Sequence, residues 1–356
     1  MSFQSRVVPL NLARVLLAAS AMLAAAPALA ETKCANPNAI GVSRVVEIDT
    51  TGGPGFGFEN YKTYDFLEPK EVVLTFDDGP QKFHTEAVLA ALADQCTKAI
   101  FFSIGKMALG YPEILRHVVE AGQTVGTHTW SHQNLRKKKV GPDAIDEIER
   151  GISAVKRAVG PNLPIAPFFR FPELADSPET LAHLQSRNIA VWSTDIDSFD
   201  FKFRNADHTV KAVIDRLEKK GKGIVLMHDI QPTTAKAIPM LLVALKQHGF
   251  KVVQVKAKTQ LQSLPEFDKA IEADVKGLAP VGSERPTSMV VRTVTDGDKK
   301  SNLGAEPMAA GQPASAAQTL PPPSGPGMPV ENRAVVASPS SDDAAKAEKK
   351  WFWQQK

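Results

Sequence analysis

The stretch Glu71-Val72-Val73-Leu74-Thr75-Phe76-Asp77-Asp78-Gly79-Pro80 joins an apolar, β-branched run to two adjacent acids and a turn. The apolar run predicts a buried strand, and Gly79 with Pro80 predicts the turn that ends it. In α/β barrels the functional groups sit at the carboxyl ends of the strands. We therefore interpret Asp77 and Asp78 as candidate site residues. The alternative is a turn with two solvated acids.

Short apolar runs alternate with helical patterns from residue 71 to residue 255. After the first strand, the strand candidates are Lys98–Ile104, Thr124–Thr127, Pro167–Phe171, Ile189–Thr194, Gly223–Met227 and Lys251–Val255. The helix signals between them cover Pro112–Ala121, Pro142–Val159, a segment from Ser177, Thr209–Lys220 and Thr234–His248. This alternation predicts a parallel sheet wrapped by helices. Seven strands suit a barrel better than an open sheet.

Two histidines four residues apart follow the strand Thr124–Thr127. Four residues span about one helical turn, so the imidazoles of His128 and His132 can face one point. Together with Asp78 they would form a His-His-Asp set, which suits zinc or a similar divalent ion with open positions for water and substrate. Two solvated histidines on a helix have the same spacing, so the pair alone does not decide the question.

A third candidate is His228, at the end of the apolar strand Gly223–Met227. Taken alone, it is as compatible with a core histidine bonded to backbone as with catalysis. Its position at a further strand end favours catalysis.

Five motifs in order and spacing resemble the polysaccharide deacetylase family, also called the NodB-homology or carbohydrate esterase family 4 domain. They are Thr75–Pro80, the pair His128 and His132, Arg170-Phe171-Pro172, Asp197-Ser198-Phe199-Asp200 and Leu226-Met227-His228. The resemblance covers about residues 70 to 258. It implies a distorted (β/α)7 barrel, similar to a TIM barrel, that removes acetyl groups from a carbohydrate.

The resemblance implies a metal site and a base. Asp78, His128 and His132 would hold the ion, zinc or else cobalt or another divalent metal. Asp77 would act as general base on metal-bound water, and Arg170 would orient Asp77. A divalent ion lowers the pKa of water to ~7 and polarises a carbonyl, which an amide hydrolase needs.

The resemblance also implies an acid and a substrate groove. His228 would protonate the departing amine, with support from Asp197. Pro172, Glu173 and Phe201 would line the groove. At the last two positions the family usually has an aromatic residue and Trp, so the wall on which a sugar stacks is altered. The backbone N–H of Glu173 could still donate to an oxyanion.

The two ends of the chain differ from its centre. Residues 1–30 place Arg6 and Arg14 before an apolar run and end in Ala28-Leu29-Ala30, the pattern of a cleaved signal peptide. A membrane anchor is disfavoured, because the run is shorter than the ~20 residues of a spanning helix. Residues 31–70 are interpreted as a Gly-rich extension, 71–258 as the catalytic domain, 259–280 as a linker or helix, and 281–356 as a disordered tail rich in Pro, Ala and Ser.

The composition of the chain limits the classes of partner that we expect it to bind. The 356 residues are 43% apolar and 23% charged, with a formal net charge of +3, which fits a globular protein. In the body of the chain no basic cluster is interleaved with aromatics, so nucleic acid is not an expected partner. The two cysteines, Cys34 and Cys96, are too few for thiolate metal chemistry. Whether they form a disulfide depends on their distance, which the sequence leaves open, as it does the oligomeric state.

The leading hypothesis is an exported, metal-dependent deacetylase acting on an acetylated polysaccharide in the periplasm, the cell envelope or the extracellular space, with no transmembrane segment in the mature chain. A carbohydrate-binding relative without turnover is the first alternative, motivated by Glu173 and Phe201. A metal-dependent amide hydrolase of a small molecule is the second, and the signal peptide argues against it.

Overall fold

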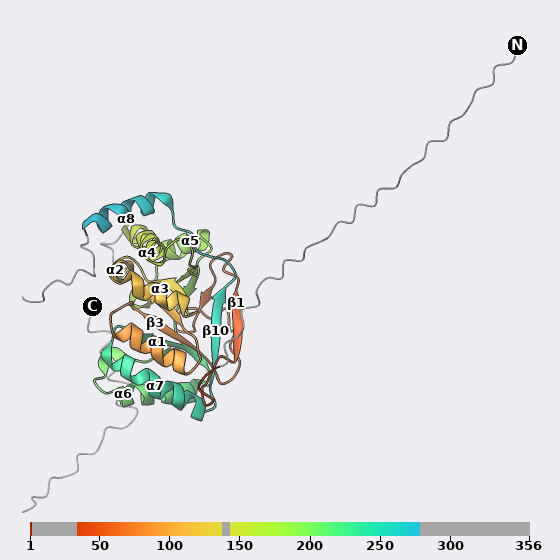
Figure 1. Ribbon diagram of the computed structural model, residues 1–356, viewed down its shortest axis with the longest axis vertical. Coiled ribbons are helices and arrows are strands. Elements are labelled where there is room, and N and C mark those ends of the chain that lie inside the picture. The colour runs from red at the N-terminus through yellow and green to blue at the C-terminus, as the bar shows by residue number, and fades with distance from the viewer. Residues whose placement is uncertain (2–33, 137–142, 278–356) are drawn as a thin grey trace, which may run out of the picture. The chain divides into compact units, whose positions relative to one another are not determined.

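The computed structural model describes residues 1, 34–136 and 143–277 (Figure 1). The chain divides into one unit of Met1–Arg285 and a second of Pro286–Lys356, and only the first contains described residues. Apart from Met1, the predicted signal peptide at 1–30 lies outside the described residues, as does the whole of the predicted tail at 281–356.

A parallel sheet forms the centre of the described unit (Figure 1). Seven of its strands lie side by side in the order β8-β9-β3-β4-β5-β6-β7. Their bounds are β3 (Glu71–Asp77), β4 (Ile100–Ser103), β5 (Thr124–Thr127), β6 (Phe168–Phe169), β7 (Ala190–Trp192), β8 (Ile196–Asp197) and β9 (Gly223–His228). Their apolar sequences suit a sheet that is covered on both faces.

This sheet curls into a distorted barrel. Arg170, just after β6, reaches Thr75 and Asp77 on β3, although β4 and β5 separate the two strands in the sheet. The end strands β7 and β8 are joined by residues 193–195 alone. Side chains from around the barrel form one apolar interior cluster, which includes Val73, Ile100, Phe102, Phe168, Trp192 and Ile224. The predicted α/β barrel is confirmed.

Helices cover the outer face of the sheet. They are α1 (His84–Asp94), α2 (Gly105–Gly110), α3 (Pro112–Glu120), α4 (Asp143–Val159), α5 (Pro178–Ser186), α6 (Ala206–Lys220) and α7 (Pro232–Gln247). A second, larger apolar cluster lies between helices and sheet. Local signals set the helix ends: the Ser177 hydroxyl accepts from Thr180 N–H at the start of α5, and Gly221 ends α6 with a φ of 81°.

The N-terminal extension belongs to the same sheet. β1 (Arg44–Ile48) pairs with β10 (Lys251–Ala257), which in turn pairs with the start of β3. At the other end of the sheet, β2 (Gly55–Phe56) pairs with β7. The strands β1 and β2 were not predicted from the sequence, although both lie within the segment interpreted as an extension.

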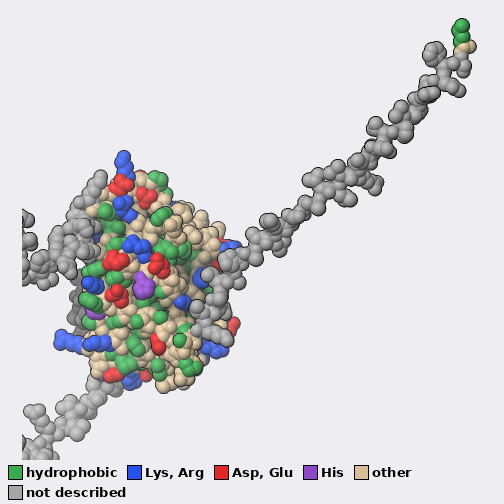
Figure 2. All heavy atoms as spheres, viewed as in Figure 1, with side chains coloured by type: hydrophobic (Ala, Val, Ile, Leu, Met, Phe, Trp, Pro, Cys, Tyr) green, Lys and Arg blue, Asp and Glu red, His purple; other side chains and the backbone are tan. Residues whose placement is uncertain are grey.

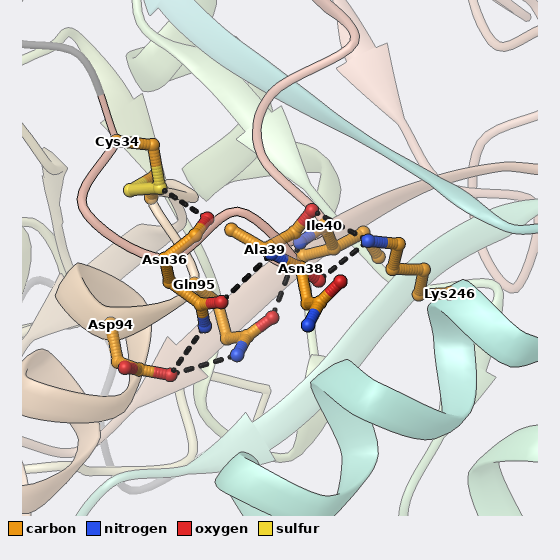
Figure 3. The surroundings of a disulfide bond; sticks show 9 residues. Cys34, Asn36, Asn38, Ala39, Ile40, Asp94, Gln95 and Lys246 are labelled. Carbon is orange, nitrogen blue, oxygen red and sulfur yellow. Dashed lines mark hydrogen bonds between the residues drawn. A yellow bond between two sulfur atoms is a disulfide. The ribbon is translucent and has the colours of Figure 1, made fainter.

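Cys34 and Cys96 form a disulfide, with their Cα atoms 5.8 Å apart (Figure 3). The question that the sequence left open is thereby answered. Figure 3 shows the segment after Cys34 lying against the end of α1, where Gln95 Oε1 accepts from Ile40 N–H. The disulfide therefore joins the extension to the barrel.

A helix at the C-terminal side completes the described unit. α8 (Pro265–Gly277), where the sequence predicts a linker or helix, packs on α4 (Figure 1). Ile271 of α8 is fully buried against Trp130 and Ala154. Within the described ranges, the helices are all too short or too polar to cross a bilayer. On the face shown in Figure 2, acidic and basic side chains are interspersed among apolar ones.

Candidate active site

The candidate residues come from loops at one end of the barrel. Asp77, the last residue of β3, is in register with His228, the last residue of β9, and with Phe102 on β4. β5 ends at Thr127, directly before His128. Because neighbouring parallel strands end at the same edge, the segments that follow them meet there, as in other barrels.

Asp78, His128 and His132 converge on one point. Asp78 Oδ1 lies 3.5 Å from His128 Nε2 and 3.3 Å from His132 Nε2, and one potential ligand atom from each residue lies within 4.8 Å of the others. Asp78 Oδ1 is buried and accepts no hydrogen bond from the described protein groups. A buried carboxylate oxygen without a donor, facing two imidazole nitrogens, fits a divalent cation. The three residues present therefore suit the divalent ion that the resemblance implies.

The two histidines do not lie on a helix, which corrects the prediction from their spacing. Residues 128–132 form an irregular loop after β5, in which Thr129 and His132 have φ values of 65° and 62°. His132 N–H donates to Thr129 Oγ1 at 3.0 Å. The left-handed residues turn His132 back toward Asp78, so the convergence comes from a strained loop.

Helix α4 and Arg170 hold this loop in place. The Glu147 carboxylate accepts from the backbone N–H and the hydroxyl of Ser131, at 2.9 and 2.7 Å, and the Glu147 carbonyl accepts from Trp130 N–H. His128 Nδ1 lies 2.7 Å from the Arg170 carbonyl, so Nδ1 carries the proton and Nε2 is left as the atom that could bind a metal. Burial lowers the pKa of His128, which favours the neutral imidazole that a metal requires.

Asp77 forms a buried ion pair with Arg170. Arg170 is 0% exposed, and its Nη1 donates to Asp77 Oδ1 at 2.8 Å and to Thr75 Oγ1 at 2.7 Å. Its Nη2 donates to the Ser193 carbonyl at 2.8 Å. The second Asp77 oxygen, Oδ2, lies 3.9 Å from His128 Nε2. One oxygen of Asp77 is thus fixed by Arg170 while the other faces His128.

His228, which is partly buried, forms a second pair, with the buried Asp200. Its Nδ1 lies 2.7 Å from Asp200 Oδ1, while Asp200 Oδ2 accepts from His228 N–H and from Thr234 Oγ1. Burial by itself lowers the pKa of His228, but the hydrogen bond and charge of Asp200 outweigh it and raise the pKa to about 9. His228 is therefore protonated at neutral pH.

The acid that pairs with His228 is Asp200, which corrects the prediction of Asp197 from the sequence. Asp197 Oδ1 instead accepts from Phe199 N–H at 2.8 Å, within the turn that follows β8. The turn places Phe199 at a φ of 51° and carries Asp200 to the His228 ring. Sequence reasoning missed Asp200, although it belongs to the same motif.

Glu173 and Phe201 belong to different loops at this end of the barrel. Glu173 follows the buried Pro172, has a φ of 56°, and its Oε2 accepts from Asn134 Nδ2 at 2.5 Å. Asn134 comes two residues after His132, so Glu173 lies next to the loop that carries His132. Phe201 is 48% exposed, and its ring meets His228 edge to face at 5.5 Å. Phe201 therefore lies beside His228.

One buried acid near these residues was not anticipated. Asp229 follows His228 in the chain, and its carboxylate contacts Gly79, the residue after Asp78, and Thr85. Burial raises the pKa of Asp229 to about 7. Its position directly after a predicted site residue was the only sequence signal.

Comparisons with known proteins point to one family. Residues 66–192 match the model of the polysaccharide deacetylase family, a range that contains Asp77, Asp78, His128, His132 and Arg170. The peptidoglycan-N-acetylglucosamine deacetylase PgdA of Listeria monocytogenes is 32% identical over 186 residues, which are 52% of this chain and 38% of that protein. Chitin deacetylase 1 of Saccharomyces cerevisiae is 34% identical over 160 residues, 44% of this chain and 50% of that protein. The chain thus spans half or less of the length of these relatives.

A solved structure agrees with the fold. The peptidoglycan deacetylase of Bdellovibrio bacteriovorus superposes with a TM-score of 0.56 at 30% identity, over 63% of this chain and 62% of that chain. The agreement includes the parallel sheet with alternating helices described above.

Proposed function

Because this chain belongs to the polysaccharide deacetylase family, we propose that it hydrolyses acetyl groups of an acetylated polysaccharide, in the first place N-acetyl groups of amino sugars. The observation that carries the proposal is the buried Asp78 oxygen, which has no protein donor and faces His128 and His132. The Asp77–Arg170 and His228–Asp200 pairs lie at the same end of the barrel.

Asp78, His128 and His132 would hold the ion, for which we propose zinc, with cobalt or another divalent ion as alternatives. When bound, such an ion activates water and polarises the acetyl carbonyl. Two imidazoles and one carboxylate leave coordination positions for both.

Asp77 supplies the base. Arg170 occupies Asp77 Oδ1, so Oδ2 is the atom that accepts a proton from the attacking water. The water oxygen then bonds to the acetyl carbon. The backbone N–H of Glu173 donates to the acetyl carbonyl oxygen, which gains negative charge in this step. Glu173 is placed for this role by its contact with Asn134, in the segment after His132.

His228 supplies the acid. Its Nδ1 is held by Asp200, so Nε2 is the atom that delivers a proton to the departing nitrogen. The carbon–nitrogen bond breaks, and acetate and a free amine leave. Without this proton the amine would leave as an anion, which is a poor leaving group. Asp197 Oδ1 accepts from Phe199 N–H, so Asp200 and not Asp197 is the hydrogen-bonding partner of His228 in this step.

Pro172, Glu173 and Phe201 would line the groove for the sugar. Phe201 offers an exposed aromatic ring beside His228, where a sugar face can stack. Glu173 places a carboxylate where the family usually has an aromatic ring, so the groove differs in charge from that of a typical member.

We also propose that the protein is exported to the periplasm, the envelope or the cell exterior. Support comes from the signal pattern at 1–30, from the disulfide, which persists in oxidising compartments, and from relatives named for peptidoglycan and chitin. We keep 71–258 as the core of the catalytic domain, to which β1, β2 and α8 add described structure.

Acetate release from chitin oligosaccharides and from peptidoglycan tests the proposed function. Release that stops with a chelator and returns with zinc or cobalt is the expected result, and the His128→Ala variant should give none. If wild-type protein with bound metal binds these glycans but releases no acetate, it is a carbohydrate-binding relative. Release from small acetylated amides alone would favour the small-molecule hydrolase.

A further inference from the structure

Asp229 is a buried acid that the proposed chemistry does not use. It is 1% exposed and directly follows His228. Asp229 Oδ1 accepts from the backbone N–H of Gly79 at 3.1 Å, and Oδ2 accepts from the Thr85 hydroxyl at 2.6 Å. The preceding residue, His228, pairs with Asp200. The Asp229 carboxylate instead contacts the turn that carries the proposed metal ligand Asp78.

Asp229 and Gly79 fit each other closely. A Cβ atom at position 79 would lie 2.2 Å from Asp229 Oδ2, so only glycine leaves room for the carboxylate. The Gly79 carbonyl is held as well, since it accepts from the Ser103 hydroxyl at 2.7 Å and from Ile104 N–H at 3.3 Å. Both polar groups of Gly79 are therefore fixed by neighbouring elements.

The hydrogen bonds of Gly79 also constrain the preceding residue, Asp78. Asp78 has a φ of 79°, in the left-handed region that residues other than glycine adopt uncommonly. Its own N–H donates to the Phe102 carbonyl at 3.2 Å. The Asp78–Gly79 segment is thus held at Asp78 by β4 and at Gly79 by Asp229, which together set the direction of the Asp78 carboxylate.

We propose that Asp229 is a positioning residue of the metal site: its carboxylate fixes Gly79 N–H and thereby the metal ligand Asp78. Because Asp229 adjoins His228, the same contact also fixes the position of Asp78 relative to His228. The proposal rests on the proposed function insofar as Asp78 is taken as a metal ligand.

Three substitutions separate the hydrogen bonds from the charge. Asp229→Ala removes both acceptors and leaves the buried Gly79 N–H unpaired. Asp229→Asn keeps an oxygen that accepts from Gly79, and its amide can donate to the Thr85 hydroxyl, which also has acceptor capacity. Thr85→Val removes the hydroxyl that donates to Asp229 Oδ2 and that also accepts from Gln81 N–H.

Glu149 provides a matched control. It is also a fully buried acid, but its carboxylate contacts His183 and Arg187 between α4 and α5. Glu149→Ala should destabilise the fold by a similar mechanism without touching Gly79.

The test is calorimetric titration of zinc into metal-stripped full-length variants, with melting temperatures of the stripped proteins and kcat and KM for acetate release. Partners that orient metal ligands typically affect affinity 10–100-fold. We expect Asp229→Ala to weaken zinc binding at least tenfold, Thr85→Val to weaken it less, and both Asp229→Asn and Glu149→Ala to stay within about threefold of wild type. The drop in acetate release should appear in kcat more than in KM.

Zinc affinity of Asp229→Ala equal to that of Glu149→Ala would overturn the proposal. If Asp229→Ala does not fold, Thr85→Val decides: unchanged zinc affinity in that variant overturns the proposal. Wild-type protein that binds zinc but releases no acetate would remove the proposed function and leave the positioning role intact. Wild-type protein that binds neither zinc nor cobalt would remove both.

Discussion

Replacing Asp77 by Asn should affect stability and catalysis for separate reasons. Arg170 is fully buried, and Asp77 is its carboxylate partner. Removing one partner of a buried ion pair costs about 3–5 kcal/mol, because the other charge is left uncompensated. The Asn oxygen can still accept from Nη1, and Thr75 Oγ1 and the Ser193 carbonyl still hold the guanidinium, so we expect about 3 kcal/mol. For a domain of this size that lowers the melting temperature by roughly 6–12 °C.

The catalytic loss should be larger than the loss of stability suggests. An amide cannot take a proton from water at neutral pH, and loss of a general base typically costs 10²–10⁴-fold in rate. Zinc affinity should change little, because the ligand cluster consists of Asp78, His128 and His132. Acetate release, zinc titration and thermal denaturation of the same preparation separate the three quantities.

Glu71→Gln is the matched control for Asp77→Asn. Glu71 is also buried and paired with an arginine, Arg44, at 2.6 Å, but at the opposite end of β3. This variant should lose stability and keep kcat. If a folded Asp77→Asn protein kept kcat within about threefold of wild type, the base assignment would be wrong. An unchanged melting temperature would contradict the reasoning about the buried charge.

Three further predictions concern other parts of the molecule. The pKa of His228 is raised from 6.5 to about 9, so the stability from its pair with Asp200 is present below pH 6.5 and lost as pH rises through about 9. Asp200→Asn should flatten this decline in denaturant titrations and shift the alkaline limb of the pH–rate profile to lower pH; identical profiles would argue against the pair. Ile271→Ala should cost about 2–5 kcal/mol and weaken zinc binding, because Ile271 packs on Trp130 between the two metal histidines; unchanged zinc titration would confine its role to stability. Cys34→Ser should cost about 3–5 kcal/mol in denaturant unfolding, and reducing agent should then have no further effect, in contrast to wild type.

The strand ends could be predicted from the sequence because each apolar run is followed at once by polar residues of a chemical type suited to a site. This placed Asp77, Asp78, His128 and His228 at one end of the barrel. The histidine pair was predicted correctly as a cluster but for the wrong local reason. Spacing alone cannot distinguish a helical turn from a loop with left-handed residues.

The choice between Asp197 and Asp200 could not be made from sequence. Both acids belong to the same short motif, and the choice depends on contacts with His228 and Thr234, which are 28 and 34 residues from Asp200. The strand β1 was missed for a similar reason. Its residues alternate between half-buried and exposed up to Ile48, and only the pairing with β10 makes it a strand.

The pairing of β1 with β10 also sets an order of assembly. The Ser43 hydroxyl donates to the Val252 carbonyl across 209 residues. The first strand of the described chain, β1, therefore cannot pair until the last strand, β10, is present. Such long-range pairing slows folding, and a strand edge without its partner can pair with other chains in the interval. The Cys34–Cys96 disulfide spans only 62 residues and depends on α1 rather than on β10. Formed early, it would keep the waiting strand beside its own barrel until β10 arrives.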